Sequence, residues 1–274
     1  MQVDENIQIM PYDRSFVQTI QVAPLATLVH TGSWQAELVH ERDHHLLIWI
    51  TRGQGRALLN GSRRGFGAHN ALYIPAGSLM AVEFGRNCLG QIMQVPATNA
   101  ISLPHRPCHL RIASSTEQAN LTSLLDSMQR ERNSDGVLSH RAIQAYGELV
   151  GIFLQRQAQI VDQSKPRRSA AKRLTQAYCA RISKFYRENL SMGDHASALG
   201  VTATHLTRAV KSQTGSTAAN LLTERQLYTA RWLLQESDLP IREISTELNF
   251  NSAAYFSRFI TQHTGQSHSG LRKS

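Results

Sequence analysis

Two short stretches of the sequence place hydroxyl and basic side chains together on one face of an expected helix. The first is ATHLTRAVKSQ, whose inner face carries Leu206 and Val210, four residues apart. The opposite face carries Thr204, Thr207, Arg208 and Lys211. Short polar groups beside an arginine are the side chains that hydrogen-bond to base edges and to phosphates in duplex nucleic acid.

The same pattern returns about fifty residues later. Leu206-Thr207-Arg208 is matched by Phe256-Ser257-Arg258, and Thr214-Gly215 by Thr264-Gly265. Upstream, Leu199-Gly200-Val201 matches Leu248-Asn249-Phe250 at a spacing of 49, so the two copies differ by one residue inserted at the turn. Over both copies, the residues expected to contact nucleic acid are Thr202, Thr204, His205, Thr207, Arg208, Lys211, Asn251, Ser252, Ala253, Ala254, Ser257 and Arg258.

Each copy predicts a helix, a tight turn and a second helix, the first at about 192–213 and the second at about 240–263. In the first copy Asp194 begins a short helix, Gly200 supplies the left-handed residue that ends it, and Thr202 caps the next helix. In the second copy Asp238 is expected to cap and Pro240 to open the first turn. Asn249 replaces the glycine, which is tolerable because Asn visits the left-handed region.

A long amphipathic helix, STAANLLTERQLYTARWLLQES, separates the two copies and would hold them at a fixed distance. Two second helices on one rigid frame can enter successive major-groove segments, about 34 Å apart on one face of a DNA duplex. The competing interpretation is that the repeats are only helical hairpins in a scaffold.

The charge distribution supports the nucleic-acid interpretation. The chain of 274 residues carries a formal net charge of +9. Residues 1–164 have a net charge of zero, and residues 165–274 hold 16 Lys and Arg against 7 Asp and Glu. The whole excess therefore lies in the C-terminal part, which would face a polyanion.

The N-terminal part has a different pattern. Short β-rich runs punctuated by glycines predict a sandwich or barrel within residues 1–112. The apolar spacing then changes to helical, so residues 113–161 are expected to form two amphipathic helices that pack on the β domain or form a dimer. Residues 162–173, which include DQSKPRRSAA, are expected to be a linker, and 174–273 a helical domain.

The stretch from Leu174 to Arg272 resembles the DNA-binding domain of AraC/XylS-type transcription regulators. The resemblance rests on LGVTATHLTRAVKSQTG, RQLYTARWLLQESDLPIREIS and LNFNSAAYFSRFITQHTG. It implies that both helix-turn-helix units contact promoter DNA and that RNA polymerase is a partner. The sequence departs from the family at Asn249, where glycine is usual, and at Ser267 to Leu271, where a proline and an aromatic residue precede the arginine.

The segment from His44 to Val95 resembles, less specifically, the cupin-like barrel that such regulators carry at the N-terminus. His44 and His45 are adjacent and should point to opposite faces of a strand. Met80 follows the Pro75-Ala76-Gly77 turn, where a cupin enzyme has its third histidine, so a metal-free barrel without a cofactor is expected. Residues that could contact a small-molecule effector inside it are Trp34, His45, Trp49, Phe66 and Tyr73.

These observations predict a two-domain α+β protein: a cupin-like β-barrel with C-terminal helices, then an all-α domain with two helix-turn-helix motifs. The predicted function is that of a sequence-specific, dimeric transcription activator without enzymatic activity. The alternatives are a cupin-type metalloenzyme with an appended helical domain, and an architectural protein that binds DNA non-specifically. Three dispersed cysteines and the lack of a secretory or membrane-spanning pattern lead us to expect a cytoplasmic location.

Overall fold

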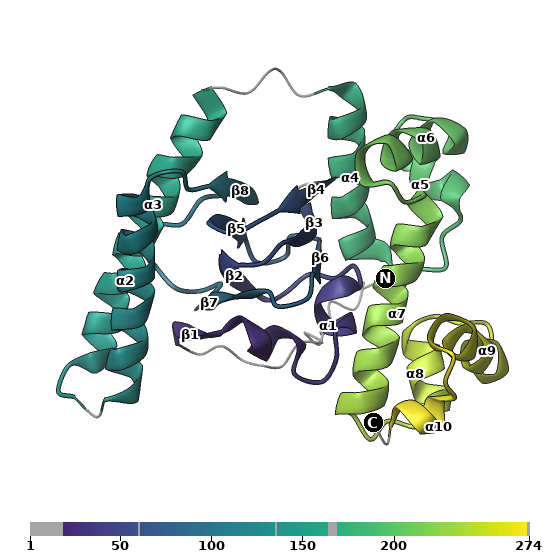
Figure 1. The fold of residues 1–274 in the computed structure, drawn as a ribbon. Helices are drawn as coiled ribbons and strands as arrows, with labels where there is room; N and C mark the ends of the chain where they lie inside the picture. The colour runs from purple at the N-terminus through teal and green to yellow at the C-terminus, as the bar shows by residue number, and fades with distance from the viewer. Residues whose placement is uncertain (1–18, 60, 135, 164–168, 273–274) are drawn as a thin grey trace, which may run out of the picture.

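The computed structural model describes residues 19–59, 61–134, 136–163 and 169–272. Its β-rich N-terminal domain lies between a pair of long helices on one side and the helices of the C-terminal domain on the other (Figure 1). The predicted order of a β domain with appended helices, followed by an all-α domain, is confirmed.

The strands of the N-terminal domain form two antiparallel sheets. The larger has the order β1-β7-β2-β5-β8 and the smaller has the order β4-β3-β6. An isolated antiparallel bridge also pairs His40 with Met80. The strands are β1 (Gln21–Pro24), β2 (His44–Arg52), β3 (Gly55–Leu59), β4 (Ser62–Phe66), β5 (Asn70–Ile74), β6 (Met80–Phe84), β7 (Leu89–Pro96) and β8 (Cys108–Arg111).

Alternation along β2 gives each face of the larger sheet its own core. Leu46, Ile48 and Ile50 belong to an apolar cluster that also contains β3, β4 and β6 side chains, so this cluster fills the space between the sheets. Leu47 and Trp49 belong to a second cluster, shared with the long helices. Both faces of β2 are therefore buried, as in a sheet covered on each side.

The helices on the outer face are the expected pair after the β domain. They are α2 (Ser115–Asn133) and α3 (Ser139–Gln163), and they pack against each other beside the sheet (Figure 1). The Ser114 hydroxyl caps α2 by accepting a hydrogen bond from the Glu117 N–H. Two short helices, η1 (Leu25–Val29) and α1 (Trp34–Glu37), precede β2, and α1 lies on the side of the C-terminal domain (Figure 1).

The C-terminal domain is entirely helical. Its elements are α4 (Ala170–Phe185), α5 (Met192–Ala198), α6 (Ala203–Thr214), α7 (Ala218–Glu236), α8 (Ile241–Glu247), α9 (Ala253–Thr264) and α10 (His268–Leu271). α3 runs to Gln163 and α4 starts at Ala170, so both helices extend into the segment expected to be a linker. Residues 164–168 of that segment lie outside the described residues.

The third hydrophobic core crosses the boundary between the two domains. Tyr178 and Ile182 of α4 and Leu222 of α7 share it with Val39 and Leu58 of the β domain. The domains thus form a packed contact in addition to their covalent connection. Among the helices in the described part of the chain, none is long and apolar enough to cross a membrane.

Candidate nucleic-acid interface

The first repeated unit consists of α5, a tight turn and α6. Ser191 caps α5 through a capping box with Asp194, and the hydrogen bonds from Ser191 lower the pKa of that carboxyl. α5 therefore begins at Met192, two residues before the expected start. Gly200 adopts a left-handed φ of +68°, and the Thr202 hydroxyl accepts a 3.2 Å hydrogen bond from the His205 N–H, as expected for the cap.

The second unit repeats this geometry with α8 and α9. Asn249 occupies the position that Gly200 has in the first unit, and its φ of +54° is left-handed. The prediction that asparagine takes the left-handed conformation of the usual glycine is confirmed. The Ser252 hydroxyl accepts a 3.1 Å hydrogen bond from the Tyr255 N–H and caps α9. The expected cap at Asp238 is wrong: Pro240 is the N-cap of α8 and makes no side-chain hydrogen bond.

The ends of α6 and α9 are also alike. Thr214 Oγ1 donates a 2.8 Å hydrogen bond to the Val210 carbonyl and accepts one of 3.1 Å from the Ser216 N–H. Thr264 makes the same two bonds, with the same lengths, to Ile260 and Gln266. A left-handed glycine follows each threonine. The sequence repeat therefore corresponds to a repeated local structure.

The two units lie at opposite ends of α7, on the side of the helix away from the sheets (Figure 1). The inner faces of α6 and α9 are buried through Leu206, Val210, Phe256 and Ile260. The predicted contact residues lie on the opposite faces, where most of them are exposed and Thr207, Ala253 and Ser257 are half-buried. Both second helices thus present their polar sides to solvent.

Tyr255 is a surface residue of α9 that the sequence reasoning did not select. Its side chain is 52% exposed, and its ring centroid lies 6.0 Å from that of Phe250 in the preceding turn. It follows Ala254 at the start of the helix, close to the other predicted contacts. The sequence did carry a signal for it. Tyr255 immediately precedes Phe256, which belongs to the buried face of the amphipathic helix, so Tyr255 falls outside that face.

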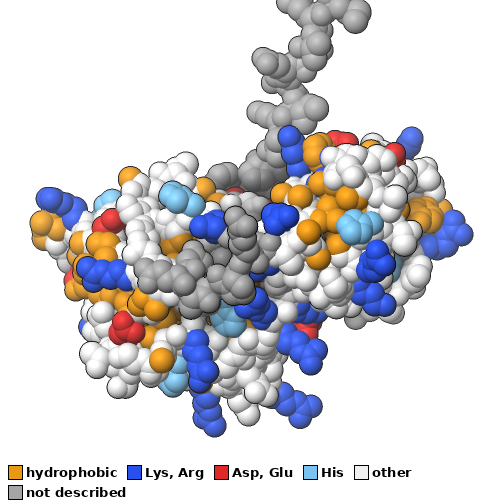
Figure 2. Space-filling view, turned by 90° about the horizontal axis from the view of Figure 1, so that it is seen from above, with side chains coloured by type: hydrophobic (Ala, Val, Ile, Leu, Met, Phe, Trp, Pro, Cys, Tyr) orange, Lys and Arg blue, Asp and Glu red, His pale blue; other side chains and the backbone are white. Residues whose placement is uncertain are grey.

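The surface is basic beside these helices. Arg208, Lys211 and Arg258 are exposed, and within the described ranges none of them forms an ion pair with an acidic side chain. In the view of Figure 2, Lys and Arg side chains are prominent over the helical domain and acidic side chains are sparse. The basic residues Lys165, Arg167 and Arg168 belong to the segment that is not described.

The five residues expected to contact an effector do not surround one cavity. Phe66 faces the core between the sheets, but Trp49 and Tyr73 lie on the outer face of the larger sheet, beneath the helices. Trp34 lies on α1, with its ring centroid 5.5 Å from that of Tyr228 in α7. These five residues therefore do not share one interior, and the space between the sheets is filled by an apolar core that contains Phe66.

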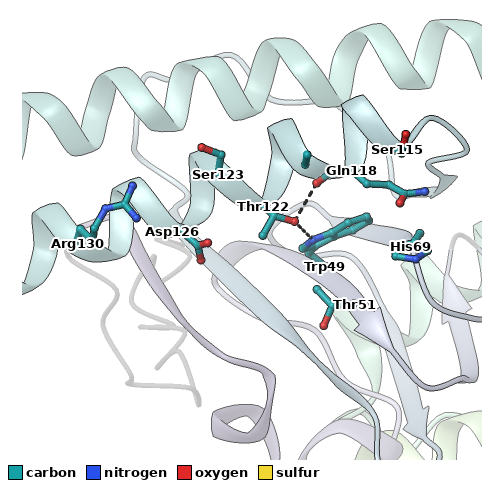
Figure 3. A pocket seen from close by; sticks show the side chains of 10 residues that line it. Trp49, Thr51, His69, Ser115, Gln118, Thr122, Ser123, Asp126 and Arg130 are labelled. Carbon is teal, nitrogen blue, oxygen red and sulfur yellow. Dashed lines mark hydrogen bonds between the residues drawn. The ribbon is translucent and has the colours of Figure 1, made fainter.

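Trp49 instead borders a cavity of about 460 Å³ between the sheet and α2 (Figure 3). Its indole N–H donates a 3.0 Å hydrogen bond to Thr122 Oγ1, and Thr122 donates to the Gln118 carbonyl. At the far end Asp126 accepts from Gln91 and Arg130 donates to Ser127. The polar groups of this cavity are largely bonded to the protein.

His44 and His45 point to opposite sides of β2, as expected. His44 lies 2.7 Å from Asp43 and 3.1 Å from the Gln94 amide, whereas His45 Nδ1 lies 3.0 Å from the Tyr73 hydroxyl and accepts from the Ala76 N–H. Burial lowers the pKa of His45, and neighbouring His44 lowers it further. In the described part of the chain, no three His, Cys, Asp or Glu side chains are grouped as a metal site.

Comparison with known proteins places the repeat in a recognised domain. Residues 195–274 match the family model described as a helix-turn-helix domain. The chain is 24% identical over 245 residues to the HTH-type transcriptional activator RhaR of Escherichia coli, covering 85% of this chain and 86% of that relative.

Solved structures of similar proteins include whole chains and isolated domains. ToxT from Vibrio cholerae O395 aligns with 93% of this chain and 97% of its own, at 9% identity and a TM-score of 0.41. The C-terminal domain of AraT, a response regulator from Geobacillus stearothermophilus, aligns with 39% of this chain and 88% of its own, at 27% identity and a TM-score of 0.35.

Proposed function

This chain is a DNA-binding transcription regulator of the AraC/XylS type, and from that premise we propose that it is a promoter-specific activator that reads DNA with α6 and α9. The observation that carries the proposal is the pair of capped second helices, one at each end of α7, with polar faces directed to solvent. A scaffold would not need exposed arginines and hydroxyl groups at the same positions of both copies.

The two helices differ in what they offer to DNA. α6 presents Arg208 and Lys211 together with threonines, so it can hydrogen-bond to base edges and neutralise phosphates. α9 begins with Ala253 and Ala254, whose methyl groups suit contact with thymine methyl groups, and it carries Arg258 further along. We therefore assign the stronger base discrimination to α6.

We further propose that the active form is a homodimer. The outer side of α3 carries exposed apolar residues: Leu149 is 49% exposed, Ile152 37% and Ile160 61%. These positions lie along one side of the helix, next to the face that packs on the sheet through Val150 and Leu154. Figure 2 shows hydrophobic side chains gathered on the side of the molecule formed by α2 and α3.

The remaining parts of the proposal follow from the regulator type. RNA polymerase is the expected protein partner, the cytoplasm the expected location, and the N-terminal domain the element that senses a small molecule, dimerises the chain, or both. In this proposal the protein acts by binding and has no enzymatic role.

The test is a footprinting experiment with the full-length chain on the DNA upstream of genes beside its own. A protected segment of about two helical turns per subunit is expected, since each recognition helix occupies one major-groove segment. Equal affinity for this DNA and for random duplex would instead support the architectural alternative. Loss of affinity with rising salt is expected in both cases and does not separate them.

A further inference from the structure

The segment just before β2 crosses the domain boundary and packs on α7. The backbone of His40 is held to β6 of its own domain, because its N–H donates a 2.9 Å hydrogen bond to the Met80 carbonyl and its carbonyl accepts one of 2.8 Å from the Met80 N–H. Its ring stacks on that of Tyr228 in α7, with centroids 4.2 Å apart and planes 3° apart. The ring of His40 is therefore a contact between the two domains.

The next residue along the chain strengthens the same contact. Glu41 forms an ion pair with Arg225 of α7, and the Arg225 Nε donates a 2.7 Å hydrogen bond to its carboxylate. Arg225 and Tyr228 stand three positions apart in α7, so they share one face of that helix. Two consecutive residues of one domain thus meet two neighbouring residues of the other. We call His40, Glu41, Arg225 and Tyr228 the domain latch.

The hydrogen bond of the His40 ring shows which of its nitrogens carries the hydrogen. Nδ1 lies 2.7 Å from the Leu38 carbonyl oxygen, which can only accept, so Nδ1 is the donor. Nε2 is then the unprotonated nitrogen of the neutral ring. It is buried and has no hydrogen-bond partner in the described part of the chain. A proton added to Nε2 would therefore be a buried donor without an acceptor.

A charged ring would also be poorly tolerated at this place. Burial holds the pKa of His40 well below its ordinary value of 6.5, and the positive charge of Arg42 lowers it further. Arg225 adds to this effect from α7, as does His44 from the segment of His40 itself. The docked protein therefore keeps the ring neutral at a pH where a solvated histidine takes up a proton.

The other groups of the latch do not compensate such a charge. The Glu41 carboxylate is already bound by Arg225. From α4 and α7 the latch is covered by the aromatic rings of Tyr186 and Tyr228, which lie against Arg225 and His40 respectively. A proton on His40 would thus add a positive charge to an interface whose carboxylate has a partner.

Glu224 of α7 also lies at the domain boundary, but it titrates in the opposite sense. Burial raises its pKa, the charge of Arg63 in β4 opposes this, and Glu83 in β6 raises it further. A carboxyl group with a raised pKa takes up its proton more readily when the domains are docked, so acid favours docking through Glu224. Release of the domains in acid can therefore not come from this group.

We propose that the domain latch is acid-sensitive: a proton on Nε2 of His40 breaks the contact with α7 and releases the helical domain from the β domain. The inference goes beyond the proposed function, because it concerns the docking of the domains and not the reading of DNA. Docking holds both reading units at a fixed position relative to α3, the proposed dimer helix, and release would remove that constraint. Since one proton links the two states, the equilibrium constant for docking falls by at most about tenfold per pH unit below 6.5.

The test measures how often the interface opens in the full-length protein without DNA. Val39 is buried in the core that the two domains share, and Val39→Cys places a thiol of similar size there. Its alkylation rate, read by mass spectrometry of that peptide and divided by the rate for glutathione at the same pH, reports the open fraction. Between pH 6.5 and 5.5 this corrected rate should rise severalfold, and at most about tenfold. A constant corrected rate would overturn the proposal.

Variants at His40 assign the rise to the latch. His40→Phe keeps a ring on Tyr228 but cannot take up a proton, so Val39→Cys combined with His40→Phe should lose the rise. His40→Gln is a second variant that cannot titrate in this range, and it serves if the Phe ring disturbs folding. Glu224→Gln is the control in which the rise should remain. An undiminished rise in the two His40 variants would contradict the proposal.

Two further thiols separate domain release from unfolding. Val150→Cys lies between α3 and the sheet, and Ile260→Cys lies inside the second reading unit, and both positions are fully buried within one domain. Because release of the domains needs less opening than unfolding, both corrected rates should stay at least about tenfold below that of Val39→Cys at each pH. Equal rates at the three thiols would mean that only unfolding is seen, and the proposal would fail. Because these assays contain no DNA, a failed promoter footprint would leave their result intact.

Discussion

The Arg225 guanidinium of α7 forms an ion pair with the Glu41 carboxylate, which lies just before β2 in the other domain. The Arg225 Nε donates a 2.7 Å hydrogen bond to Glu41 Oε2, and Nη2 donates to Oε1. The guanidinium carbon also lies 3.7 Å from the centre of the Tyr186 ring, and Nη1 donates to Thr229. This cluster joins residues 184 positions apart in the sequence.

Substituting Glu41 by glutamine should destabilise the protein strongly. The Arg225 side chain is 5% exposed, so Glu41→Gln leaves a buried guanidinium without its counter-charge. Removing one partner of a buried pair typically costs about 3–5 kcal/mol. Denaturant unfolding of the full-length protein measures the loss.

The exposed pair Arg187–Glu247 provides the control for that variant. Its nitrogen and oxygen are 3.2 Å apart, and both side chains are more than a quarter exposed. Glu247→Gln should therefore cost no more than about 1 kcal/mol. Similar costs for Glu41→Gln and Glu247→Gln would mean that the interdomain pair is hydrated in solution and does not fix the domain contact.

Arg208→Ala should weaken binding to the specific site by about 1–3 kcal/mol if Arg208 reads a base. The side chain is exposed on the polar face of α6, beside Thr204 and Thr207. Affinities for the footprinted site and for random duplex, measured at the same salt concentration, give the change in specificity. Arg64→Ala, at an exposed arginine of β4, is the control and should change neither affinity.

An equal loss on both duplexes would assign Arg208 to a phosphate instead. Lys211 offers the comparison, because a lone ammonium group at the end of α6 suits a phosphate better than a base edge. Lys211→Ala should weaken binding to all sequences and reduce the slope of the salt dependence by about one.

The helix-turn-helix units were predictable because their signals are local. Thr202 caps α6 three residues from its hydrogen-bond partner, and Gly200 and Asn249 each occupy the left-handed turn position. These features depend on neighbouring residues only, so a repeat in the sequence translates into a repeat in structure. The cap of α8 was the exception, since Asp238 stands two residues further from the helix than the actual N-cap, Pro240.

The aromatic side chains of the β domain were not predictable in the same way. Trp49 and Ile48 are both buried, because one face of β2 packs on the other sheet and one on α2 and α3. β2 therefore lacks alternation between polar and apolar residues. The local sequence does not show which of its residues face the other sheet and which face α2 and α3. The contacts of Trp34 and Glu41 with α7 depend on docking of the two domains, for which the sequence carries no periodic signal.

Ile160→Glu should disrupt the proposed dimer. Ile160 is 61% exposed on the outer face of α3, so a charge there costs the monomer little but opposes burial in an interface. Sedimentation measurements of the full-length protein should show a shift from dimer to monomer. Glu substitution of Val137, which is 95% exposed at the turn before α3, is the control and should leave the dimer intact. A dimeric Ile160→Glu protein would place the interface elsewhere.

Stability should fall as the pH drops below about 6.5, and His40 should account for part of this. Its ring is fully buried, stacks on Tyr228 with centroids 4.2 Å apart, and lies near Arg42 and Arg225. Burial holds the pKa of His40 well below its usual value, and the two arginines lower it further. Below pH 6.5 the unfolded chain therefore binds a proton at His40, whereas the folded chain does not. The contribution of His40 to stability is thus complete above the unfolded pKa and declines below it.

His40→Phe keeps the stacking but cannot titrate, and should flatten the dependence of unfolding free energy on pH between about 7.5 and 5.5. An undiminished dependence in His40→Phe would assign the acid sensitivity to other groups, with buried His195 as the next to test.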